Sequence, residues 1–186
     1  MPLRALLKQF AERGLDKAGI KLIGEGSVAD DEILNDMGDV ALGLVTSHPY
    51  SVSHHSPANK KFVEAFMEQS KGVRPNFLGV AAYDGMRVIY EAGKATKGAG
   101  DGDALVAAMK SQIFKSPRGL ICIDAQTRDI VQNVYIRRVE RVNGQRYSME
   151  FDVMKDVKNP AKGGKQHPAR RHIEVAYHLV GNCACA

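Results

Sequence analysis

The stretch from Lys115 to Arg141, KSPRGLICIDAQTRDIVQNVYIRRVER, constrains the fold more than any other part of the chain. Its Pro-Arg-Gly sequence predicts a tight turn, because Pro117 presets φ and Gly119 can adopt a positive φ. The all-apolar run Leu120–Ile123 predicts a buried strand. After a polar connection, Val134–Val142 mixes β-branched residues with arginines, which predicts a second strand with one side partly in water. The stretch therefore predicts a hairpin that joins a helical region to a sheet.

The composition limits the class of protein. The chain has 186 residues, of which 44% are hydrophobic and 25% are charged, as in ordinary globular domains. No apolar run reaches the roughly 18 residues that a membrane-spanning helix needs. The N-terminal sequence MPLRALLKQF has neither an apolar core nor a small-residue cleavage site, so we expect no signal peptide in this chain.

The positive charge is concentrated near the C-terminus. Residues 155–172 contain six Lys and Arg residues against a single Asp, which equals the net charge of +5 of the whole chain. Because the rest of the chain is close to neutral in net charge, we do not expect its folded part to bind nucleic acid. The composition, rich in Lys, Gly, Pro and Gln, predicts that residues 161–186 form a basic, flexible tail.

Residues 1–46 predict a helix, a strand, a second helix and a second strand. The spacing i, i+3, i+4, i+7 of a helix face joins Leu3, Leu6, Leu7 and Phe10. Ile20–Ile23 predicts a short buried strand, and Val40–Thr46, which is apolar throughout, predicts a second. Between them, the pattern Ser27-x-x-Asp30 predicts the cap of a helix. Strands this apolar indicate a parallel pair in a sheet that is covered on both faces.

The next part of the chain predicts a crossover followed by three helices. Residues 47–56, SHPYSVSHHS, are polar and contain Pro, so we expect a connection. The predicted helix starts are Ser56-Pro57, Asn76, and Asp101 or Asp103. The second helix is expected to run to Ala95 and to pack through Ala81, Gly85, Val88, Ile89 and Ala92. The third helix is expected to extend through Ile113.

The cysteines and the histidines near the C-terminus do not form a recognised metal motif. Cys122 lies inside the apolar run, which indicates a small core residue. Cys183 and Cys185 form a C-x-C pair at the end of the chain. The histidines before that pair have no recognised ligand spacing; they are His167, His172 and His178. We therefore predict no metal site and no cofactor.

Serines and histidines gather in residues 47–56, where they suggest three alternatives. His48 and the pair His54-His55 would bind a metal, titrate near neutral pH, or assist a serine nucleophile. No Asp, Glu or Cys lies at a fixed spacing, so solvated hinge residues are favoured. The sequence also lacks G-x-S-x-G, a phosphate-binding loop and H-E-x-x-H. We therefore predict no catalytic residues and no enzyme.

Further motifs occur in a fixed order along residues 3–160. They are LLKQFAERGL, IKLIGEGSVADD, GDVALGLVTSHPY, PANKKFVEAF, AAYDGMRVIYEA, FKSPRG and DVKNP. Together with the final hairpin, they resemble the type I periplasmic solute-binding proteins, the branched-chain amino acid-binding family of ABC importers. The resemblance implies an α/β clamp of two lobes that closes on a small solute and delivers it to a membrane permease. It also implies a periplasmic location for the full-length parent.

The resemblance implies that this chain is the C-terminal half of such a clamp, with parallel-sheet remnants of two lobes joined by hinge crossovers. Residues 1–46 resemble part of the second lobe, 47–56 a hinge crossover, 57–138 the returning part of the first lobe, and 139–160 a return crossover. Residues 161–186 match nothing in the family and are the basic tail. The expected hinge residues are Ser47, His48, Tyr50 and Val139. An unpaired sheet edge in such a half is expected to favour self-association.

The expected ligand site starts at the loop after the first strand. Open α/β sheets bind ligands at the carboxyl ends of strands, and the backbone N–H groups of Ser27 and Val28 at a helix N-terminus suit a carboxylate. Glu25 suits a cation such as an α-ammonium group; alternatively it is solvated beside a capped helix. In the family a carboxylate near this loop contacts the ligand's ammonium, but here Gly26 takes that position. Phe77 and Leu78 begin the helix that faces the cleft in the family, although both also suit a core.

Three functions remain open from the sequence. The first is a solute-binding component that recognises a small amino acid, an amide, or an aromatic or other carboxylic acid between its lobes. The second is a cytoplasmic ligand-sensing domain of the same fold. The third is an interaction protein that binds nucleic acid or an anionic surface through its basic tail, residues 155–171.

Overall fold

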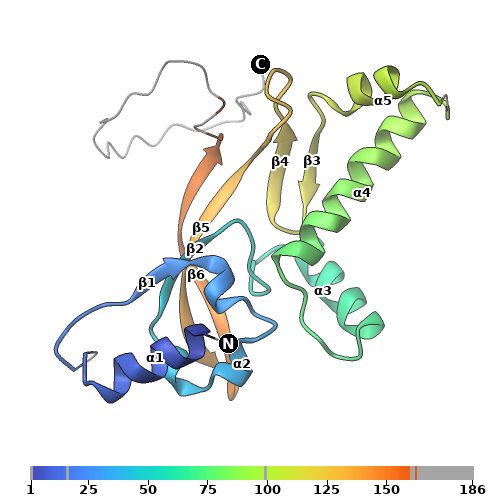
Figure 1. Ribbon diagram of the computed structural model, residues 1–186. Coiled ribbons are helices and arrows are strands. Elements are labelled where there is room, and N and C mark those ends of the chain that lie inside the picture. Colours follow the sequence, from blue (N-terminus) through green and yellow to red (C-terminus); the bar gives the residue numbers. More distant parts are fainter. Residues whose placement is uncertain (1, 16, 99, 160–161, 163–186) are drawn as a thin grey trace.

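The computed structural model describes residues 2–15, 17–98, 100–159 and 162. The helices are α1 (Pro2–Glu12), α2 (Leu34–Met37), α3 (Pro57–Gln69), α4 (Phe77–Ala95) and α5 (Gly102–Met109), with 3-10 helices η1 (Gly26–Ala29) and η2 (Asp39–Ala41). The strands are β1 (Ile23–Glu25), β2 (Val45–His48), β3 (Ile113–Ser116), β4 (Gly119–Ile123), β5 (Ile130–Val142) and β6 (Gln145–Val157). This mixed arrangement, shown in Figure 1, confirms the predicted α/β class.

None of the helices in this described part of the chain is long and apolar enough to cross a membrane. Of the predicted tail, residues 161–186, the structure describes only Lys162, so the prediction of a flexible tail and the C-x-C pair lie outside the described residues. Lys162 itself forms an ion pair with Asp129, with 2.8 Å between Nζ and Oδ1.

The six strands form one sheet around a long hairpin made of β5 and β6. The strand order is β1-β2-β5-β4-β3, and β6 pairs with β5. β1 and β2 are parallel, as predicted, whereas every other pair among these strands is antiparallel. β2 pairs with Tyr135–Arg138, while β4 pairs with Ile130 and Val131 nearer the start of β5. The hairpin therefore links the part of the molecule around α1 and α2 to the part around α3, α4 and α5 (Figure 1).

The two predicted N-terminal strands are displaced toward the C-terminus. The strand predicted at Ile20–Ile23 is wrong in its bounds, because β1 starts only at Ile23, whose side chain is 75% exposed. The strand predicted at Val40–Thr46 is also displaced, because the chain forms η2 and then turns at Gly43 with φ of 81°. Leu22, Val40, Ala41 and Leu44 from these runs pack in irregular segments against the core that contains Leu7 of α1, whereas Ile20 and Ile23 are exposed. Ala41 and Leu44, for example, belong to that core.

The helix predicted after Ser27 is much shorter than expected. Glu25, not Ser27, caps η1 through its side chain, and α2 begins only at Leu34. Asp30 does not cap this helix, because its carboxylate accepts the backbone N–H of Phe77 at the start of α4, at 3.3 Å. Tertiary contacts have therefore replaced the local cap that the spacing predicted. The first hydrophobic core consists of Leu7, Ala29, Leu34, Met37, Ala41, Leu44 and Val139.

The three predicted helix starts are confirmed at α3, α4 and α5. Ser56 Oγ accepts the N–H of Asn59 at 3.1 Å, and the side chains of Asn76 and Asp101 cap α4 and α5 in the same way. These caps are local, so the sequence is sufficient to identify them. A second hydrophobic core lies at this end of the molecule and contains Tyr50, Phe62 and Val80.

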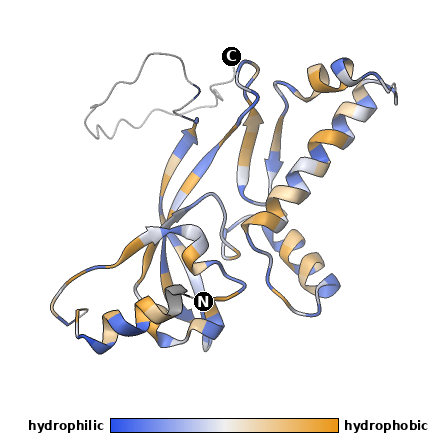
Figure 2. Ribbon diagram, in the orientation of Figure 1, coloured by the Kyte–Doolittle hydropathy of each residue, from blue (hydrophilic) through white to orange (hydrophobic). Residues whose placement is uncertain are grey.

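The buried face of α4 differs from the prediction. Its buried residues are Val80, Asp84 and Ala92, whereas the predicted Ile89 is half exposed. Asp84 lies inside because its carboxylate accepts from Arg118 Nε at 2.8 Å and from the hydroxyl of Ser116. An apolar pattern cannot reveal this buried ion pair. Figure 2 shows α4 coloured as hydrophobic along much of its length, and its exposed apolar side chains include Leu78, Met86 and Tyr90.

The turn at Pro117–Gly119 and the strand after it are confirmed, but two strands were not predicted. Gly119, the first residue of β4, has φ of 106°, and Cys122 is fully buried. The third helix ends at Met109, so Ile113 begins β3 rather than ending a helix. β6 occupies most of the stretch predicted as a return crossover. Its signal is the Asn-Gly pair at 143–144, with φ of 50° and 81°, which is a strong hairpin turn signal.

Candidate functional site

The candidate site lies where the parallel strands β1 and β2 end side by side. Glu25, the last residue of β1, pairs with Ser47 of β2, and His48 follows directly. After Glu25 the chain enters η1. Residues 25–27, here called the Glu25 loop, therefore lie beside His48. Phe77, at the start of α4, contacts the His48 ring with 5.0 Å between ring centroids and 64° between ring planes.

Glu25 is held by three hydrogen-bond donors but remains open to solvent. Its Oε2 accepts the backbone N–H of Ser27 at 3.0 Å and also the Ser27 hydroxyl. Its Oε1 lies 3.2 Å from His48 Nδ1, and the side chain is 63% exposed. Partial desolvation opposes ionisation, but the hydrogen bonds from Ser27 and His48 dominate and lower the pKa of Glu25. The prediction that the Ser27 N–H is open for a ligand carboxylate is wrong, because Glu25 occupies it.

His48 is buried beneath the Glu25 loop, with only 3% of its surface exposed. The loop can lie this close because residue 26 is Gly, whose added Cβ would fall well under 3.0 Å from the Cβ and Cγ of His48. Burial, and next the positive charge of Arg137, lower the pKa of His48 to about 4, although Glu25 opposes the shift. The imidazole is therefore neutral at pH 7. The interpretation of His48 as solvated is wrong, whereas its place in the hinge stays a prediction.

Arg137 lies fully buried below the loop and was not predicted from the sequence. Its guanidinium donates to the carbonyl oxygens of Gly26 at 3.0 Å and Tyr50 at 2.6 Å, and Nε donates to Thr46 Oγ1 at 3.3 Å. One side chain from β5 therefore fixes η1, β2 and the following connection. From the arginines interleaved in β5, the sequence predicted that one side of this strand faces water. Only the tertiary structure shows that Arg137 is the one that is buried.

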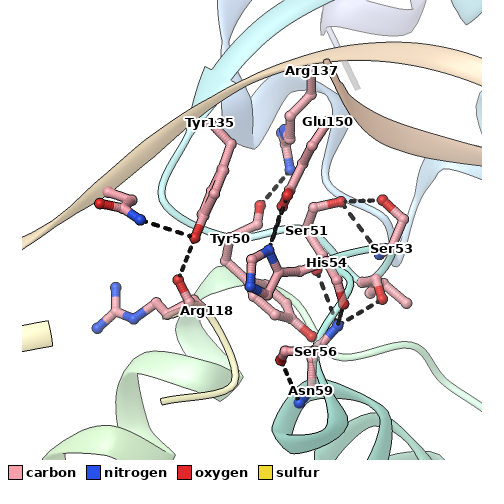
Figure 3. A network of polar contacts seen from close by, with 12 residues as sticks. Tyr50, Ser51, Ser53, His54, Ser56, Asn59, Arg118, Tyr135, Arg137 and Glu150 are labelled. Atoms are coloured by element: carbon pink, nitrogen blue, oxygen red, sulfur yellow. Dashed lines mark hydrogen bonds and ion pairs between the residues drawn. The ribbon is translucent and has the colours of Figure 1, made fainter. Parts of the chain in front are cut away.

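The connection after β2 is tied to β6 by a network of polar contacts (Figure 3). The hydroxyls of Ser51 and Ser53 donate to the carbonyl oxygen of Ser148 at 2.5 and 2.7 Å. His54 Nδ1 lies 2.9 Å from a carboxylate oxygen of Glu150. The prediction of solvated residues is therefore wrong for His54 as well. These contacts show that the connection and β6 form one unit rather than a loose linker.

The predicted site residues separate into two groups. Glu25, Gly26 and Phe77 lie against His48, and Ser27 is hydrogen-bonded to Glu25. Leu78 is 70% exposed at the start of α4. Tyr50 is fully buried in the second core, which contradicts its interpretation as a solvated residue, and Val139 is buried in the first core. Ser47 lies in β2, between β1 and β5.

A shallow groove of about 370 Å³ opens beside the Glu25 loop. Its lining residues are Ile23, Gly24, Glu25, Val45, Thr46, Ser47 and Ile136. Within the described ranges, no group of three or more His, Cys, Asp or Glu side chains is arranged to hold a metal ion. The site instead offers a carboxylate, a serine hydroxyl and a buried imidazole. This set is suited to hydrogen bonding with a small organic molecule.

Comparison with known proteins identifies the family. The sequence model of the family described as periplasmic binding protein matches residues 2–145. A solute-binding protein of an ABC transporter from Rhodopseudomonas palustris BisB5, in complex with 3,4-dihydroxybenzoic acid, is 55% identical with a TM-score of 0.80; the match covers 86% of this chain and 44% of that one. A second such protein, from R. palustris HaA2 in complex with p-hydroxybenzoic acid, is 37% identical with a TM-score of 0.79, covering 87% and 44%.

A curated relative gives the same picture. The Leu/Ile/Val-binding protein homolog 6 of Brucella abortus is 38% identical over 159 residues, which are 83% of this chain and 40% of the relative. The chain thus spans less than half the length of the relatives it matches. Those relatives are transporter solute-binding proteins, which are not enzymes. The match over most of its residues and the shared fold show that the chain belongs to the family of type I periplasmic binding proteins.

Proposed function

We propose that this chain is part of the solute-binding component of an ABC importer, and that the solute is a small aromatic carboxylic acid with ring hydroxyl groups. The observation that carries the proposal is the 55% identity to the R. palustris BisB5 protein in complex with 3,4-dihydroxybenzoic acid. The HaA2 relative, in complex with p-hydroxybenzoic acid, supports the same class of ligand.

An amino acid is the second candidate solute. It is favoured by the name of the Brucella relative, which refers to Leu, Ile and Val, at 38% identity. The aromatic acid is preferred because identity to the BisB5 protein is much higher over a similar share of this chain. Both candidates are small molecules that a carboxylate and a hydroxyl at the end of β1 can contact.

The proposed ligand contacts are Glu25, Gly26, Ser27, Phe77 and Leu78. Support comes from the position of the Glu25 loop at the carboxyl end of a parallel strand, where open α/β sheets bind ligands. The groove beside this loop and the aromatic ring of Phe77 add an apolar wall. Leu78 is exposed next to Phe77 and is available to a ligand.

The division into lobes is also part of the proposal. Residues 1–46 form part of the second lobe and 57–138 part of the first, with crossovers at 47–56 and 139–160. Two separate hydrophobic cores, one around Leu7 and Val139 and one around Tyr50, support this division. In the hinge, Ser47, His48 and Tyr50 belong to the first crossover and Val139 to the second.

The proposed partner is the membrane permease of the importer, and the full-length parent works in the periplasm. The alternative of a cytoplasmic sensor domain would need no permease. Self-association is proposed through the outer edges of the sheet, because β1 and β3 are its end strands and their residues Ile23 and Ile113 are exposed. No nucleic acid partner is proposed.

Saturation-transfer NMR on this chain tests the class of solute. We expect 3,4-dihydroxybenzoate at millimolar concentration to receive saturation from the protein, and leucine at the same concentration to receive much less. A clamp derives its affinity from two lobes, so we expect the affinity of this chain to be weaker than micromolar by calorimetry. Binding of leucine with no signal from 3,4-dihydroxybenzoate would reverse the assignment in favour of an amino acid.

A further inference from the structure

The hydrogen bonds at the Glu25 loop have a fixed direction. The ionised carboxylate of Glu25 can only accept, so the nitrogen of His48 that faces it, Nδ1, carries the proton. In a neutral imidazole the other nitrogen, Nε2, is then an acceptor. This Nε2 is buried and has no hydrogen-bond partner among the described residues. The exposed carboxylate of Glu25 is therefore open to a ligand donor, whereas Nε2 of His48 is enclosed.

Among the described residues that line the groove beside the Glu25 loop, none carries a positive charge that a ligand carboxylate could meet. His48 is neutral at pH 7, as its low pKa shows. Arg137 and Arg118, the two arginines that act on His48 electrostatically, are both buried. Arg137 donates to backbone carbonyls and to Thr46, as described above. Arg118 donates to Asp84 at 2.8 Å and to Gln132 at 2.6 Å. A ligand carboxylate placed here would meet an anion and lose its hydration without compensation.

We infer that the Glu25 loop binds the hydroxyl-bearing end of the aromatic ring, while the ligand's carboxylate lies away from this loop. Glu25 accepts a hydrogen bond from the ligand's hydroxyl group, and His48 holds Glu25 in position. The inference rests on the proposed function and specifies how the ligand is oriented. His48 is a positioning residue, because it acts through Glu25. Gly26 belongs to the same arrangement, since a side chain there would displace the imidazole.

A hydroxyl group fits this site better than an α-ammonium group, although both are donors. In an α-amino acid the carboxylate is attached to the same carbon as the ammonium, so it would approach the negative charge of Glu25. In a hydroxybenzoate the aromatic ring separates the hydroxyl from the carboxylate, which weakens this repulsion. Phe77, whose ring packs against His48 next to the loop, is the aromatic side chain that we propose for contact with the ligand ring.

The test is a titration of this chain, labelled with nitrogen-15, by catechol, benzoate and 3,4-dihydroxybenzoate. Catechol has the hydroxyls without the carboxylate, and benzoate has the carboxylate without the hydroxyls. We expect catechol to shift the amide signals of Ser27, His48 and Phe77 with a Kd roughly tenfold below that of benzoate, as for one charge-assisted hydrogen bond. Glu25→Gln should remove this preference, whereas Glu68→Gln, at an exposed carboxylate of α3, should keep it.

The outcomes separate the inference from the proposed function. If 3,4-dihydroxybenzoate shifts these signals but benzoate binds as well as catechol, or if Glu25→Gln leaves catechol binding unchanged, the orientation is wrong while the solute class stands. If 3,4-dihydroxybenzoate shifts only signals outside the Glu25 loop, the orientation is wrong as well. If none of the three compounds shifts any signal, both the inference and the proposed function are overturned.

Discussion

Replacing Gly26 with Ala should destabilise the chain by about 2–4 kcal/mol, from overpacking and from weakened hydrogen bonds to charged groups. The added Cβ would lie well under 3.0 Å from three atoms of His48. His48 cannot move aside easily, because it is buried and its ring contacts Phe77. The loop must shift instead, which lengthens the bond from Arg137 to the Gly26 carbonyl, now 3.0 Å.

Backbone strain does not contribute to this effect, since Gly26 lies outside the left-handed region. Gly85→Ala is the matched control, because Gly85 lies in α4 and its added Cβ would have no heavy atom within 4 Å. An alanine there should stabilise the helix by about 0.5–1 kcal/mol. Urea unfolding followed by far-UV circular dichroism measures both free energies of unfolding. If Gly26→Ala is neutral or stabilising, as Gly85→Ala should be, the close contact with His48 does not exist.

The remaining predictions concern the turn, the buried histidine and the weaker end of the molecule. Gly119→Val should cost about 1–3 kcal/mol, because φ is 106° and a Cβ would lie 2.7 Å from Tyr135 Oη; an unchanged urea midpoint would contradict this. The pKa of His48 is about 4 in the folded state against 6.5 unfolded, so its contribution to stability is complete above pH 6.5 and is lost as the pH falls toward 4. His48→Gln should flatten the dependence of stability on pH in this window, and an unaltered slope would refute the assignment. By hydrogen exchange, the amide of Leu44 should exchange before that of Ile121, because the Leu44 N–H donates only to Ala41 within a local turn, at 3.2 Å, whereas Ile121 lies in β4, which is paired with β3; equal protection in a monomer would disprove it.

The parts of the fold that the sequence predicted are those with local causes. The caps Ser56, Asn76 and Asp101 bind N–H groups within three residues, and Gly119 adopts the positive φ that its turn requires. The apolar runs were sufficient to predict that β1 and β2 are parallel. They did not predict where either strand begins and ends. The Asn-Gly pair at 143–144 was an available local signal for β6 that the prediction did not use.

The parts of the site that the sequence did not predict depend on contacts between distant residues. The Glu25 loop was predicted from its place after a strand, but nothing in the sequence indicates that His48 lies beneath Gly26. Arg137 lies 111 residues from Gly26 and reaches it only through the pairing of β2 with β5. The buried face of α4 likewise differs from the predicted one, because Asp84 is buried in an ion pair with Arg118.

The most direct test of the proposed solute site is a set of intermolecular nuclear Overhauser effects between 3,4-dihydroxybenzoate and the labelled chain at millimolar concentration. The ring protons next to the hydroxyl groups should show contacts to Ser27 and Phe77, and Glu25→Gln should abolish them. Contacts confined to another surface of the chain, or contacts to these two residues from leucine but not from 3,4-dihydroxybenzoate, would contradict the proposed site and its ligand.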